Sequence, residues 1–70
     1  MSTRDLPAQI GDLPSIGRPA TGALMSAGIT TLAQVAAHRR ADLLAMHGVG
    51  PKAIRILDAA LEERGLGFAG

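Results

Sequence analysis

The chain has 70 residues, of which 47% are hydrophobic, and this composition predicts one small folded domain and excludes a disordered tail. It contains no cysteine, which excludes disulfide bonds and thiolate metal sites. Seven Lys and Arg residues against six Asp and Glu give a net charge of +1, so binding to phosphate requires a local cluster of cations rather than the field of the whole protein.

The sequence does not have the pattern of a membrane or secreted protein. Its start, MSTRDLP, has no apolar run behind Arg4, which predicts no signal peptide. The longest uncharged stretch, 19–37, contains Pro19, Gly22 and Gly28, which are typical of a soluble helix–turn–helix and not of a membrane span. We therefore expect a cytoplasmic protein with no membrane partner.

Polar and turn-forming residues predict a flexible N-terminal lead over residues 1–11. A single domain is expected over 12–68, followed by a short tail at 69–70. Within the domain, Pro19 suits the first turn of a helix, and Gly28 suits the end of that helix. Thr31 and Gln34 have the spacing of a capping box, which predicts the start of a second, short helix.

The second half of the domain predicts two further helices. The basic run 38–40 breaks the apolar pattern and is interpreted as a solvated connector rather than a second binding patch. One short helix is expected over 41–46 and the longest over 51–64, ended by Gly65, with Leu66 folding back over the helix end. Phe68, the one aromatic residue, is expected to pack on the bundle.

No window of residues alternates as a strand does, so the fold class is all-α, a compact bundle of four to five helices. Small aliphatic side chains must form the core, with Met25 and Met46 filling gaps. The residues expected to be buried are Leu24, Leu32, Val35, Leu44, Val49, Ile54, Leu57 and Leu61.

An internal repeat is the most informative feature of the sequence. The segments 16–20 and 49–53 both read apolar, Gly, two others, Ala, and their offset is 33 residues. Leu24 then corresponds to Leu57, and Gly28 to Gly65, which lies four residues further on in the second copy, or about one extra helical turn. The chain therefore contains two helix–hairpin–helix units, and we expect their glycine-containing turns to lie close together on one side, related by a pseudo-two-fold axis.

The second hairpin has the features of a site for anions. Gly48 and Gly50 flank Val49, which is expected to anchor the turn in the core while the backbone amides on either side face outward. The turn leads into a helix N-terminus, where free N–H groups bind anions. Cations occupy these first turns: Lys52 and Arg55 in the second unit and Arg18 in the first. A weak pair between Arg55 and Asp58 would not divert Arg55 from a phosphate.

The stretch from Leu44 to Ile54, with Gly-Val-Gly-Pro-Lys-Ala at its centre, resembles the helix-hairpin-helix motif of DNA-binding proteins that do not read sequence. From Leu13 to Leu66 the chain resembles the C-terminal domain of the alpha chain of bacterial RNA polymerase, which is a SAM-domain-like double helix-hairpin-helix. The resemblance implies contacts with the minor groove and the phosphate backbone. Gly50 and Lys52 match its second contact region. In the first contact region, the position of the family's main arginine is occupied by Pro19. The resemblance therefore implies contact with the DNA backbone rather than selection of sequence.

These observations predict a small DNA-binding module that acts as a monomer and does not select sequence. The residues expected to bind DNA are Gly17, Arg18, Gly48, Val49, Gly50, Lys52 and Arg55. The alternative is a protein-docking module that binds no nucleic acid. We expect no enzymatic activity, metal or cofactor, because no catalytic constellation is present and His38 with Asp42 offers only two ligands.

Overall fold

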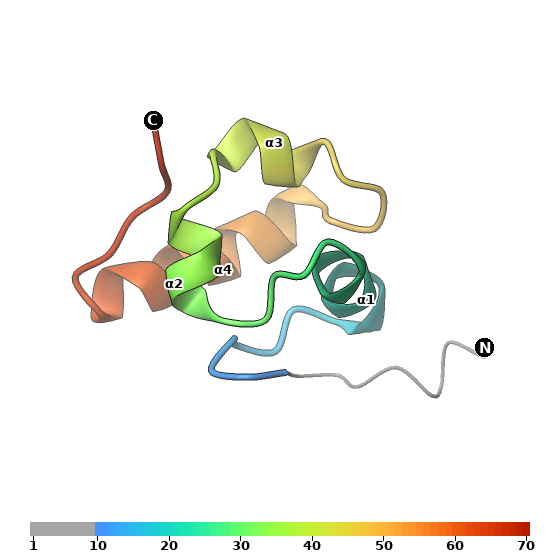
Figure 1. Ribbon diagram of the computed structural model, residues 1–70, viewed down its shortest axis with the longest axis horizontal. Coiled ribbons are helices and arrows are strands. Elements are labelled where there is room, and N and C mark those ends of the chain that lie inside the picture. Colours follow the sequence, from blue (N-terminus) through green and yellow to red (C-terminus); the bar gives the residue numbers. More distant parts are fainter. Residues whose placement is uncertain (1–9) are drawn as a thin grey trace.

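The computed structural model describes residues 10–70, and within them the chain is all-α, with four helices and no strand, as predicted. In chain order these are α1 (Arg18–Ser26), α2 (Leu32–Ala36), α3 (Arg40–Leu44) and α4 (Pro51–Glu63). α4 is the longest helix and packs against α2 and α3, while α1 lies at one end of the molecule (Figure 1). The helix predicted over 41–46 is shifted toward the N-terminus, because the chain turns after Leu44.

One aliphatic core joins all four helices. The residues predicted to be buried are buried, except Leu44. The buried apolar residues are Leu13, Ala20, Leu24, Ile29, Leu32, Val35, Leu43, Val49, Ala53, Ile54, Leu57 and Leu61.

The predicted burial of Leu44 is wrong. α3 is only five residues long, and consecutive helical residues point about 100° apart, so one of two adjacent leucines faces the core. Leu43 takes that position at 1% exposure, and Leu44 is 42% exposed. The expected place of Met25 in the core is also wrong: Met25 is 39% exposed, because its neighbour Leu24 faces the core. Met46 packs against the core as predicted.

α1 and α4 end in the same way, as the repeat predicts. At the end of α1, the N–H of Ile29 donates to the carbonyl of Leu24 at 2.8 Å. At the end of α4, the N–H of Leu66 donates to the carbonyl of Leu61, also at 2.8 Å. Each of these hydrogen bonds joins residues five apart in the sequence, which is the pattern of a Schellman motif. Only Ile29 completes the apolar contact, since it is buried whereas Leu66 is 41% exposed.

Side chains hold the two ends of the domain in place. Asp12 accepts a hydrogen bond from the N–H of Leu32, at the start of α2, and its second oxygen pairs with Arg64 at 3.1 Å. The predicted capping box of Thr31 and Gln34 is present at the same helix end. Ile10 also packs against the core, so the packed region includes residues before the predicted boundary at 12; positions 1–9 of the expected lead lie outside the described residues.

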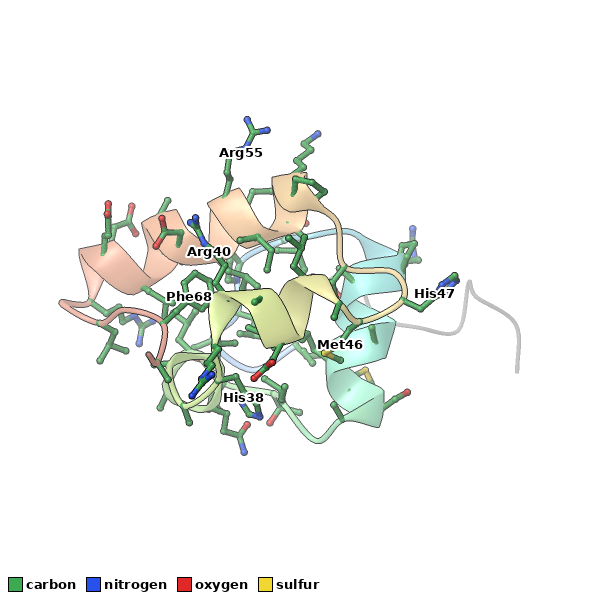
Figure 2. All side chains as sticks on the ribbon, turned by 90° about the horizontal axis from the view of Figure 1, so that it is seen from above. His38, Arg40, Met46, His47, Arg55 and Phe68 are labelled. Carbon is green, nitrogen blue, oxygen red and sulfur yellow. The ribbon has the colours of Figure 1, made fainter. Side chains whose placement is uncertain are left out.

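The C-terminal residues lie against the junction of α2 and α3. The N–H of Ala69 donates to the carbonyl of His38 at 2.9 Å. Phe68 packs against the core as predicted, and the guanidinium of Arg40 lies 5.6 Å from the centre of its ring (Figure 2). The last residues are therefore bound to the body of the domain.

Val49 is 5% exposed, which confirms its predicted place in the core. We expect Val49→Asp to lower the free energy of unfolding by about 3 kcal/mol or more, because it buries a carboxylate without a partner. A domain of this length has about 3.5–10 kcal/mol in total, so the variant should lose a large part of its stability and melt at a much lower temperature by circular dichroism. The exposed substitution Ala59→Asp is the control, and an unchanged melting temperature for Val49→Asp would contradict the anchoring of the turn.

Candidate nucleic-acid interface

The turn between α3 and α4 lies directly against the start of α1. Gly48 has a φ of +95°, and a Cβ atom at this position would stand 2.8 Å from the carbonyl oxygen of Pro19. Both the backbone conformation and the close approach therefore require glycine. The predicted juxtaposition of the two glycine-containing turns on one side of the molecule is confirmed.

A hollow of about 350 Å³ lies between these two turns. It is lined by Ser15, Ile16, Gly17, Pro19, Ala20, Gly48, Gly50, Lys52, Ala53 and Ile56. The hollow thus brings together four of the predicted contact residues from both halves of the repeat. Val49 does not line it, because its side chain is buried in the core; Arg18 is exposed between the lining residues Gly17 and Pro19.

The two helices that begin at the hollow lack the usual N-terminal caps. α1 begins after Gly17 and α4 after Gly50; neither residue gives a side-chain hydrogen bond, and neither first turn contains an acidic residue. The other helices differ, since α2 has its capping box and α3 has Asp42 in its first turn. The free N–H groups and partial positive charges of α1 and α4 are therefore left without an acidic partner beside one hollow.

Cations surround these helix starts. Arg18, Lys52 and Arg55 are exposed, and none of them has an ion pair with another residue in the range 10–70. Lys52 lines the hollow, and Arg55 follows three residues later and extends outward from α4 (Figure 2). Like charges at this spacing repel each other slightly, so the pair does not stabilise the helix.

Two other arginines are neutralised. Arg64 pairs with Asp12, and Arg40 pairs with Asp58 at 3.1 Å. The interpretation in which Asp58 pairs with Arg55 is therefore wrong. Asp58 lies beside α3, and Arg40 reaches it from there. Arg55 consequently stays unpaired among the described residues.

The two glycines that flank Val49 have different roles. Gly50 is extended, with a φ of −101°, and a Cβ at this position would meet no atom within 4 Å. The fold therefore requires glycine at position 48 but not at position 50. Without a side chain at Gly50, the backbone at the start of α4 is accessible from the hollow.

Sequence reasoning missed the apolar surface of the hollow. Ile16, Ala20, Ala53 and Ile56 line it, although the apolar pattern assigns such residues to the core alone. One signal was present: Ile56 is four residues after Lys52, so the two side chains share a face of α4.

Comparison with protein-family models, with curated proteins and with solved structures finds no match for this chain. Among the described residues, no helix has both the length and the apolar character needed to span a membrane.

The two glycines give a stability test of this geometry. We expect Gly48→Ala to lower the melting temperature by several degrees, because alanine is strained at this φ by about 1–2 kcal/mol and its methyl group meets the carbonyl of Pro19. Gly50→Ala should change stability by less than about 1 kcal/mol, since its conformation suits any residue. Thermal unfolding of both variants checks this, and equal destabilisation would contradict the described turn.

Proposed function

We propose that this chain is a cytoplasmic, monomeric DNA-binding module that contacts the phosphate backbone along the minor groove and does not select sequence. In this proposal the bundle consists of two helix-hairpin-helix motifs in a SAM-domain-like arrangement, similar to the C-terminal domain of the polymerase alpha chain. Two observations support the double motif. The ends of α1 and α4 each have the same type of hydrogen bond, and Leu24 and Leu57 are equally buried.

The observation that carries the proposal is the convergence of two uncapped helix N-termini at one hollow, with the unpaired cation Lys52 lining it and Arg18 and Arg55 near the same helix starts. Phosphate satisfies such a set of groups, because its oxygens accept hydrogen bonds from free N–H groups and its charge is attracted to the cations. Two helix starts side by side suit successive phosphates of a polymer rather than one isolated ion.

The charges of α4 are arranged for binding rather than for helix stability. Lys52 and Arg55 lie near its N-terminus, and Asp58, Glu62 and Glu63 lie toward its C-terminus. This order opposes the helix dipole, which favours acidic residues at the start and basic residues at the end. α4 is therefore a polar helix whose basic end is at the hollow, which the net charge of +1 does not reveal. Such a charge distribution would orient the protein with its hollow toward DNA.

The lining of the hollow supports binding without sequence selection. In the minor groove, A·T and T·A pairs present the same acceptors, so readout there is largely limited to A·T against G·C. Among the described residues, the polar groups that line the hollow are Ser15, Lys52 and the backbone. Backbone amides and lysines contact phosphates, which carry no direct sequence information.

The salt dependence of binding tests this proposal. A module that neutralises about three phosphates should show a slope of log K against log salt of roughly −2 to −3 on duplex DNA. Its dissociation constant should lie in the range of ~10⁻⁴–10⁻⁶ M that is usual for nonspecific binding. Fluorescence anisotropy with duplexes of unrelated sequence measures both, and a strong preference for one sequence would contradict the proposal.

Lys52→Glu should weaken binding to every duplex alike and reduce the magnitude of the salt slope by about 1 or more, with the fold intact because Lys52 is exposed. Arg39→Glu is the charge-matched control, because Arg39 is exposed at the start of α3 and does not line the hollow. Its effect should be small where salt screens distant charges. If Lys52→Glu binds as well as the parent, or if no duplex shifts the backbone amide signals of residues 47–50 and Lys52 in NMR spectra, the protein-docking function replaces DNA binding.

A further inference from the structure

The hollow combines an apolar floor with a basic rim. Among the described residues, five lining side chains consist of carbon atoms only and are here called the floor: Ile16, Pro19, Ala20, Ala53 and Ile56. At its edge stand Lys52, which lines it, and the exposed Arg18, which is flanked by two lining residues. No acidic side chain of the described residues lines it. The complementary ligand is therefore anionic at its edges and rich in carbon between them.

We propose that the hollow receives a 2′-deoxyribose of the bound strand, and that Ile16 and Ile56 thereby make the module select DNA over RNA. The proposal rests on the function proposed above, because phosphates bound at the rim place the sugar between them over the floor. In DNA the 2′ carbon of that sugar is a methylene group, which suits an aliphatic surface.

Ribose carries a hydroxyl group at the same carbon. Against Ile16 and Ile56 this hydroxyl would lose its hydrogen bonds to water and find no replacement from either side chain. The discrimination therefore comes from one unsatisfied polar group, which is how a binding site rejects an analogue that differs by a hydroxyl. We expect DNA to bind about tenfold more tightly than RNA, which corresponds to about 1.4 kcal/mol.

Three duplexes of one sequence, made of DNA, RNA and 2′-fluoro RNA, distinguish the effect of the 2′-hydroxyl on affinity from the effect of helix shape. RNA differs from DNA both in its 2′-hydroxyl and in its A-form grooves. A 2′-fluoro RNA duplex keeps the A-form geometry without the hydroxyl. Anisotropy titrations should give affinities for the 2′-fluoro duplex within about threefold of DNA. An affinity as weak as that of RNA would show that groove shape makes the selection, and would overturn the proposal.

Variants of the floor assign the selection to named residues. Ile56→Thr keeps a β-branched side chain and offers a hydroxyl group to the ribose, so the DNA-to-RNA affinity ratio should fall at least threefold. Ala59→Thr is the matched control, since Ala59 is exposed on α4 and does not line the hollow; its ratio should stay at the parent value. Ile16→Thr makes the same test from the opposite turn if Ile56→Thr does not fold by circular dichroism.

Ser15 provides an internal check, because among the described residues it contributes the one side-chain hydroxyl group that lines the hollow. Ser15→Ala should leave the ratio unchanged; weaker binding to RNA alone would show that the ribose hydroxyl finds a partner, and would overturn the proposal. Equal affinities for all three duplexes would overturn the sugar selection and leave DNA binding intact. Absence of binding to all three would overturn both.

Discussion

The contact between Gly48 and the backbone of Pro19 is the constraint on which the rest of the site depends. α4 packs directly against α2 and α3, and this contact sets the distance of its preceding turn from the start of α1. Any larger residue at position 48 would push the two turns apart. The same contact places the first turns of α1 and α4 beside one hollow, so the geometry that completes the fold also assembles the groups that we propose bind phosphate.

The stability of the domain alone does not account for the hollow. A side-chain cap contributes about 1 kcal/mol, and a favourable charge in the first turn contributes about 0.3–1 kcal/mol. Both are absent from α1 and α4, although α2 receives its capping box and a further hydrogen bond from Asp12. Aspartate or asparagine at Gly50, where φ is −101°, would supply the missing acceptor for α4, whereas Gly17 has a φ of +89°, which favours glycine. Such an acceptor would also compete with an external phosphate for the same N–H groups, which gives the uncapped ends a physical reason.

Local signals in the sequence were sufficient to predict the helices. The internal repeat was sufficient to predict that the two glycine-containing turns lie close together. Glycine at helix ends, proline in first turns and the Thr31 capping box each act within a few residues, so the sequence reveals them directly. The choice between Leu43 and Leu44 could not be predicted, because five residues of helix define no clear apolar face. The partner of Asp58 was missed for a different reason: Arg40 is 18 residues away and meets it only through packing. The floor of the hollow depends in the same way on two turns that are distant in the sequence.

The two kinds of surface in the hollow respond differently to conditions, and this separates their roles. Attraction between the rim cations and phosphate weakens as added salt reduces the gain from counterion release, whereas contact between a sugar and an aliphatic floor does not depend on counterions. Affinity should therefore fall steeply with salt while the preference between deoxyribose and ribose changes little. If charge alone made the selection, the preference for DNA over RNA would weaken together with the affinity as salt is added. The rim, with Arg18 and Lys52, thus governs how strongly a strand is bound, and the floor, with Ile16 and Ile56, governs which sugar is accepted.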